Sequence, residues 1–292
     1  AASPLAENSN TATLDTSSLY DDLTYSDAAS LSERWLRSSS RARADLSDNL
    51  GAYTNEEIDY HISEANNQGS DPLVRAESAL MVGQAYEFGQ GGLPQDFALA
   101  RQYYKQAAHV LPEAHEALGI MDIYGLDGGE PNYDEGRWRL ELAGTGSALT
   151  LLGELYQTGY LDTLDNTERD EQLRRAWGYY VKANDQDYAP ASTNLGLMVL
   201  FAEDPDSLKK MAAAKKKKTR ASSSTFITSS FAADPDYKQV RQYLERALSL
   251  AENGRKEGLT YDPLKLTPYY YLGLMASNGW GFPPNSCPAA AR

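Results

Sequence analysis

Histidine and cysteine are the side chains with the widest catalytic repertoire, and this chain has few of them. The histidines are His61, His109 and His115, and the single cysteine is Cys287. None of the histidines stands at a His-x-x-x-His or Cys-His spacing, which a zinc site would need. Cys287 would become a nucleophile only if the fold brought a histidine close to it. We therefore expect surface or capping histidines, no catalytic residue, no metal ion and no cofactor.

A glycine-rich stretch, Gly89-Gln90-Gly91-Gly92, is the other feature that invites a chemical interpretation. Glycine-rich loops can cradle phosphate groups when a Lys-Ser/Thr pair follows the glycines and a strand precedes them. This stretch lacks the Lys-Ser/Thr pair, and no strand is predicted before it. The sequence therefore favours a turn between two helices over a phosphate-binding loop.

The charge of the chain is unevenly spread. The formal net charge is −14 at pH 7, which disfavours nucleic acid as a specific partner because phosphate binding needs a basic surface. Between Lys209 and Arg220 lie seven basic residues and no acidic ones. Three interpretations of this basic insert stay open: a solvated loop, a contact with an acidic surface of another protein, or a contact with nucleic acid or anionic lipid. Its candidate partner-binding residues are Lys215, Lys216, Lys217 and Lys218.

The first fifty residues differ in composition from the rest of the chain. Eleven of them are serine, and long hydrophobic runs are missing, so this segment buries too little apolar surface to offset the entropy lost on ordering. Leu31, Trp35 and Leu36 are spaced for one helical face, which predicts a short docking helix in a polar arm. Trp35 is therefore a candidate partner contact. No apolar stretch approaches the roughly 18 residues of a membrane helix, so we expect a soluble chain without a transmembrane segment.

Glycine recurs after an apolar residue inside helical patterns. The steps between these glycines are 36, 34, 43 and 77 residues, the last being about two ordinary steps. Fixed periods of about 20–50 residues are typical of solenoids, which stack one structural unit on the next. The positions in this series are Gly83, Gly119, Gly153, Gly196 and Gly273.

A second series, at offsets 0, 4 and 7, lies after each of the first four glycines and places three side chains on one helical stripe. A small or β-branched residue is followed by a large one and then by alanine. The sets are Ala100, Tyr104, Ala107; Gly136, Leu140, Ala143; Ala176, Tyr180, Ala183; and Val240, Leu244, Ala247. Together the two series predict repeats that each consist of a helix A, a turn and a helix B. Within a repeat the two helices should approach each other closely at the glycine of helix A and the alanines of helix B. One such hairpin cannot bury its apolar face alone, so the hairpins must stack.

The first unit carries a family resemblance. Ala79, Leu80, Gly83 and Tyr86 fit a first helix, and the stretch from Asp96 to Ala108 follows the pattern Asp-x-x-x-Ala-x-x-Trp/Tyr-Tyr-x-x-Ala-Ala. This resembles the Sel-one-like repeat family, relatives of tetratricopeptide repeats, over roughly residues 72–281. In the third unit Tyr156 takes the place of Tyr86. The departures are a second unit with the turn Asp127-Gly128-Gly129 and a displaced Trp138, and a fourth unit split by the basic insert.

The fold class predicted is all-α, a right-handed α–α superhelix of about four to five helix-pair repeats with an extended N-terminal arm. The expected boundaries are a polar, partly disordered or partner-ordered arm at 1–50, a solenoid at 51–281 and a tail at 282–292, with an insert loop at 203–233. Thr54 and Glu57 form a capping-box pattern at the start of the solenoid, and Asp71-Pro72 is a second helix-start signal. Trp280, near the end of the last helix, is a further candidate partner contact.

The resemblance implies a protein that holds other proteins. We expect a non-catalytic scaffold, an accessory or assembly subunit of a larger organellar or membrane-associated complex, in a eukaryotic organelle or secretory lumen rather than the cytosol. One alternative is a lumenal adaptor of endoplasmic-reticulum-associated quality control, which the stretch from Gly91 to Asp96 favours and the absence of Asn-x-Ser/Thr acceptors disfavours. The second alternative is a hydrolase of unknown type.

Overall fold

The computed structural model describes residues 53–161, 169–220, 235–253 and 263–282, all within one compact unit at 44–292. In these ranges the chain forms α-helices and no strand. The fold-class prediction of an all-helical solenoid is confirmed. The expected arm at 1–50 and all but the first residue of the expected tail lie outside the described residues.

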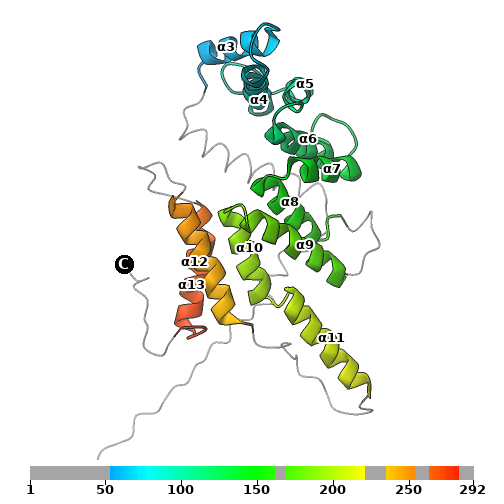
Figure 1. The fold of residues 1–292 in the computed structure, drawn as a ribbon, viewed down its shortest axis with the longest axis vertical. Helices are drawn as coiled ribbons and strands as arrows, with labels where there is room; N and C mark the ends of the chain where they lie inside the picture. The colour runs from blue at the N-terminus through cyan, green and yellow to red at the C-terminus, as the bar shows by residue number, and fades with distance from the viewer. Residues whose placement is uncertain (1–52, 162–168, 221–234, 254–262, 283–292) are drawn as a thin grey trace, which may run out of the picture. The chain divides into compact units, whose positions relative to one another are not determined.

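Each helix in the repeat region packs on its neighbours in sequence, with one exception: α10 packs on α12 and bypasses α11. Helix A and helix B of the repeats are α4/α5, α6/α7, α8/α9 and α10/α12, and α13 packs beside α12 (Figure 1). The bounds are α3 (Asn55–Asn66), α4 (Pro72–Phe88), α5 (Phe97–Ala107), α6 (Pro112–Tyr124), α7 (Tyr133–Ala143), α8 (Gly146–Gln157), α9 (Arg169–Asn184), α10 (Ala189–Leu200), α11 (Pro205–Arg220), α12 (Tyr237–Asn253) and α13 (Pro263–Ser277).

The helix starts that the sequence predicted are present. The backbone N–H of Glu57 donates to the Thr54 hydroxyl over 3.2 Å, and the Thr54 N–H donates to the Glu57 carboxylate over 2.8 Å, which completes the capping box of α3. Asp71 caps α4 by accepting from the N–H of Leu73, with Pro72 in the first turn. Gly89 ends α4 at φ +66°, a left-handed conformation that favours glycine. The glycine-rich stretch is therefore an interhelical turn, as predicted.

In two pairs the helix-A glycine lies against a buried tyrosine ring of helix B. A Cβ atom added to Gly83 would lie 2.6 Å from Cε1 of Tyr104, and one added to Gly153 would lie 2.6 Å from Cδ1 of Tyr180. Both rings are fully buried. These distances are far below van der Waals contact, so only glycine lets the two backbones approach this closely.

In the other two pairs leucine takes the place of the tyrosine. A Cβ atom on Gly119 would lie 3.0 Å from Cγ of Leu140, and one on Gly196 would lie 3.2 Å from Cδ2 of Leu244. The two series found in the sequence therefore meet each other in space, one glycine to one large residue per pair. For Gly273 on α13 no described atom lies within 4 Å of such a Cβ, since the described residues hold no helix B after α13.

The hydroxyl groups of the two buried helix-B tyrosines, Tyr104 and Tyr180, each donate to a polar side chain on helix A. The Tyr180 hydroxyl donates to the Gln157 side chain over 2.8 Å, and the Tyr104 hydroxyl donates to Glu87. Gln157 and Glu87 each stand four residues after their repeat glycine. Where helix B carries leucine, the equivalent helix-A residues are apolar. Those residues are Ile123 and Leu200.

Loss of one of these hydroxyl groups should destabilise the fold. Tyr180→Phe leaves the partly buried Gln157 side chain one hydrogen bond short, which should lower the free energy of unfolding by about 1–2 kcal/mol. Chemical denaturation followed by circular dichroism measures the loss. Tyr60→Phe is the matched control, because Tyr60 is 58% exposed on α3 and should change stability by less than about 0.5 kcal/mol. Equal effects of the two changes would contradict the pairing.

One predicted feature of the chain differs from the structure. A loop was expected at 203–233, but residues 205–220 form the helix α11, so the prediction is wrong for that part. The Asp204 carboxylate accepts from the N–H groups of Asp206 and Ser207 over 3.0 and 3.1 Å, which caps the helix. Leu208 is buried, and α11 packs on α9. Residues 221–234 lie outside the described residues.

Candidate binding groove between α7 and α9

A hollow of about 380 Å³ lies between α7 and α9. Its lining includes a stripe of α9 at spacings i, i+3, i+4 and i+7, which fall on one helical face. Tyr156 of α8 belongs to the lining and is itself buried. We call this site the α7–α9 groove. The lining residues are Arg137 and Glu141 from α7, Tyr156 from α8, and Arg175, Gly178, Tyr179 and Lys182 from α9.

Two tyrosines stack in the groove. The rings of Tyr156 and Tyr179 have centroids 5.6 Å apart and planes 12° from parallel. Arg137 donates to the Tyr156 hydroxyl over 3.3 Å, and the Tyr179 hydroxyl donates to Glu141 over 2.7 Å. Burial, and then the hydrogen bond to Glu141, raise the pKa of Tyr179 well above its usual range. Tyr179 therefore stays a neutral hydrogen-bond donor at physiological pH.

The cations of α9 lie over these rings. The Arg175 guanidinium is 5.6 Å from the centroid of Tyr156, and the Lys182 ammonium is 5.4 Å from that of Tyr179. A cation over an aromatic face is attracted by the ring quadrupole, so the rings orient both cations without cancelling their charge. With Arg137 the lining carries three cations against one carboxylate, Glu141. Outside the lining, Asp134 lies 3.2 Å from Arg137 and Glu171 lies 3.6 Å from Arg175. Lys182 is the lining cation for which the described residues show no ion pair.

The first repeat has the same tyrosine stack without the cations. Tyr86 and Tyr103 stack at 5.8 Å and 16°, and they occupy the positions that Tyr156 and Tyr179 occupy in the third repeat. The residues of α5 equivalent to Arg175, Gly178 and Lys182 are uncharged. They are Leu99, Gln102 and Gln106. The positive charge therefore belongs to the α7–α9 groove rather than to the repeat pattern.

Gly178 differs from the repeat glycines. It lies in the middle of α9, and no described atom lies within 4 Å of a Cβ built on it. Its φ is not in the left-handed region. Neither a close contact with described atoms nor the backbone conformation therefore requires glycine there. The open space above Gly178 is part of the groove.

Two apolar side chains of α7 are exposed near the groove. Trp138 is 50% exposed and Leu142 is 51% exposed, and their i, i+4 spacing places them on one face of the helix. Arg139 lies 5.6 Å from the Trp138 ring. The sequence pattern singled out Trp138 only as displaced from the usual aromatic positions. The available signal was an aromatic and an aliphatic residue four apart, off the stripe formed by Gly136, Leu140 and Ala143.

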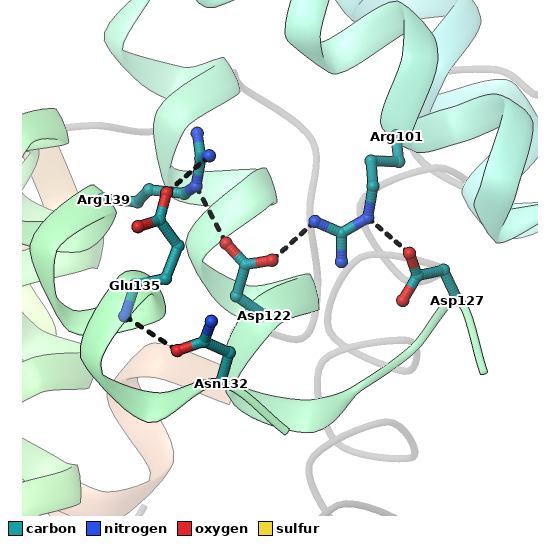
Figure 2. A network of polar contacts seen from close by, with 6 residues as sticks. All are labelled: Arg101, Asp122, Asp127, Asn132, Glu135 and Arg139. Carbon is teal, nitrogen blue, oxygen red and sulfur yellow. Dashed lines mark hydrogen bonds and ion pairs between the residues drawn. The ribbon is translucent and has the colours of Figure 1, made fainter. Parts of the chain in front are cut away.

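An ion-pair network on another side of α7 fixes that helix (Figure 2). The Asp122 carboxylate of α6 lies 2.5 Å from Nη1 of Arg101 on α5 and 2.8 Å from Nε of Arg139 on α7. Arg101 also pairs with Asp127 at 2.6 Å, and Arg139 pairs with Glu135 at 2.7 Å. The network therefore ties the first helix pair to the second and positions α7, which lines the groove.

The partner-binding residues expected from the sequence do not gather at this groove. Trp280 stacks on Tyr237 at 5.2 Å and packs on the core cluster of α10, α12 and α13. The lysines of the basic insert lie on α11, with their side chains outside what the structure describes, and Trp35 lies outside the described residues. Their contacts with a partner stay predictions. The lysines are Lys215, Lys216, Lys217 and Lys218.

The residues with catalytic potential are placed as follows. His61 shares a hydrogen bond of 3.1 Å with the Ser78 hydroxyl, and burial is the main factor that lowers the pKa of His115. In the described ranges, no group of three or more His, Cys, Asp and Glu residues is arranged to hold a metal ion. Cys287 falls beyond those ranges.

None of the described helices combines the length and apolar character that a membrane span requires.

Helix pairs stacked through glycine contacts define an α-helical solenoid of short repeats. Residues 76–109, 112–143 and 146–188 match the family model of the Sel1 repeat, and these ranges correspond to the pairs α4/α5, α6/α7 and α8/α9, except for the first four residues of α4. The chain therefore carries Sel1 repeats in these three helix pairs. The pair α10/α12 continues the same glycine contact beyond the matched ranges.

Several solved structures are similar to this chain, among them the following two. One is a Sel1 repeat protein from Oxalobacter formigenes, at 17% identity and a TM-score of 0.52, with 81% of this chain and 74% of that chain covered. The other is c5321, a protective antigen of uropathogenic Escherichia coli with an SLR fold, at 21% identity and a TM-score of 0.37; 78% of this chain and 49% of that chain are covered. The first similarity supports the solenoid fold. No curated protein matches the sequence significantly.

Proposed function

We propose that the chain is a non-catalytic scaffold that binds another protein through α7 and α9, as an accessory or assembly subunit of a larger complex. The observation that carries the proposal is the exposure of Trp138 and Leu142 beside the tyrosine-lined groove. Trp, Tyr and Arg are the residues that most often dominate the binding energy of protein interfaces. All three types gather on this surface.

The repeat architecture supports the same proposal. Solenoids present extended surfaces on which partners lie, and Sel1 repeats are a family of this architecture. The endoplasmic-reticulum adaptor, the hydrolase and the organellar or lumenal compartment stay predictions, since no described contact favours one of them. A contact of the basic α11 with an acidic neighbour likewise stays a prediction.

Affinity purification from the native source, with mass spectrometry of the co-eluting proteins, tests this proposal. The wild-type chain should retain a stoichiometric partner, and Trp138→Ala with Leu142→Ala should weaken that partner's binding by about 30-fold or more, as loss of a central aromatic anchor does. Tyr60→Ala on α3 is the matched control, because Tyr60 is exposed to a similar degree. Recovery of the chain alone would contradict a permanent subunit. A partner that survives the double change would contradict the placement on α7.

A further inference from the structure

We propose that the α7–α9 groove binds an extended acidic segment of the partner protein, with two carboxylates on Arg175 and Lys182 and the residues between them on the tyrosines. This inference rests on the proposed scaffold function and adds the chemistry of the partner.

Charge complementarity is the first reason. The lining has three cations and one carboxylate, and the hydroxyl of Tyr179 already engages that carboxylate. Asp134 and Glu171 also approach Arg137 and Arg175, at 3.2 and 3.6 Å. For Lys182 the described part of the chain shows a tyrosine ring and no carboxylate. One carboxylate of the partner would therefore pair with Lys182, and the other would share Arg175 with Glu171, which is 47% exposed. Both cations are held over aromatic rings.

The second reason is the open space at Gly178. Glycine inside a helix is less favourable than alanine, and no described neighbour of Gly178 requires it. The equivalent residues of the other B helices are Gln102, Trp138 and Gln242, all with long side chains. A side chain of that length at Gly178 would fill the space between Arg175 and Lys182. The glycine therefore keeps the groove open at the point where a segment running along α9 from Arg175 to Lys182 would pass.

The third reason is the spacing of the two cations. Arg175 and Lys182 are seven residues apart, which is about 10 Å along a helix. In a polyproline II segment the residues i and i+3 lie on one face about 9 Å apart. Aromatic-lined grooves are the usual docking sites of such segments, because little entropy is lost on binding. The Tyr156–Tyr179 stack supplies that aromatic lining, so the segment we expect has acidic residues three apart and prolines between them.

The test is fluorescence anisotropy with the full chain and a labelled peptide, Glu-Pro-Pro-Glu-Pro-Pro-Glu. The wild-type chain should bind it, and the same peptide with Gln in place of Glu should bind at least about tenfold more weakly. Lys182→Gln should weaken binding of the acidic peptide by about fivefold, and Glu141→Gln should strengthen it by a few-fold, because one removes a positive charge and the other a negative one. Lys105→Gln on α5 is the matched control and should change nothing.

Substitutions at Gly178 test whether the open space of the groove is needed for peptide binding. Gly178→Ala should keep peptide binding, whereas Gly178→Trp should abolish it by filling the groove, with circular dichroism to show that both variants are folded. Equal binding of the Glu and Gln peptides, or full binding by folded Gly178→Trp, would overturn the inference. If no peptide binds while the native partner is retained and then lost in the Trp138/Leu142 variant, this inference fails and the scaffold function stands.

Discussion

Gly153→Ala is expected to lower the free energy of unfolding by about 2–3 kcal/mol, at the upper end of the usual cost of overpacking a core. The new methyl group would lie 2.6 Å from Cδ1 of Tyr180. That ring is fully buried, and its hydroxyl is held by Gln157, so it cannot move aside without losing a hydrogen bond. The backbones of α8 and α9 must therefore separate, and the pair loses its close packing.

Gly178→Ala is the matched change on α9, the helix that pairs with α8. It should raise the free energy of unfolding, whereas Gly153→Ala should lower it. No described atom opposes its methyl group, so it should stabilise the chain by up to about 1 kcal/mol through helix propensity. Chemical denaturation measures both variants, and hydrogen exchange of α8 and α9 locates the effect, since repeat arrays do not always unfold in one step. If both variants were more stable than the wild type, or both less stable, contact with the tyrosine ring would not be the reason why position 153 requires glycine.

The repeat core could be predicted from sequence because the glycine of helix A and the large residue of helix B both recur at fixed positions along the chain. Glycine and a large residue such as Tyr180 stand at fixed places in helices A and B, and the large side chain fills the space that the glycine leaves. The offsets of 0, 4 and 7 then assign the buried face of helix B. The sequence patterns therefore predicted the helix pairs and the buried face of helix B. They placed the close approach at the alanines, whereas the structure places each glycine against the large residue.

The helix α11 was missed although its start signal was present. Asp204-Pro205 is the same Asp-Pro pattern as Asp71-Pro72, which correctly marked the start of α4. The lysines and serines of this region favoured a loop by composition. Composition describes the surface of a segment, whereas Leu208 and the cap at Asp204 show that the first turn of α11 packs on the solenoid. Such a docking contact is not visible in a local pattern.

The groove was beyond sequence analysis for a different reason. Arg137 and Lys182 are 45 residues apart, and only the packing of both α7 and α9 on α8 brings them to one hollow. The repeat pattern fixes which residues face the core. Which exposed residues of two neighbouring helices face each other depends on their packing register, which the turn lengths alter. The open space at Gly178 likewise depends on where the neighbouring helices lie, which the residue type alone does not predict.

Asp122→Tyr is expected to give the largest destabilisation, about 3–5 kcal/mol, because it removes one partner from a largely buried ion-pair network. The side chain of Asp122 is 10% exposed, and those of Arg101 and Arg139 are 16% and 19% exposed. Arg101 keeps Asp127, and Arg139 keeps Glu135, but both lose the carboxylate that joins them. The link between the first and second helix pairs is therefore cut (Figure 2).

The neighbouring repeats offer a designed rescue. Asp122 and Arg139 occupy the positions that Tyr86 and Tyr103 occupy in the first pair, where the two rings stack at 5.8 Å. Asp122→Tyr combined with Arg139→Tyr should therefore restore more than half of the lost stability, since a stacked pair replaces the ion pair without leaving Arg139 unmatched. A double-mutant cycle by chemical denaturation measures the coupling, which should exceed about 1.5 kcal/mol. Additive losses would show that the two positions are not interchangeable between repeats, and that the Asp122 bridge to Arg101 alone sets the packing of the second pair on the first.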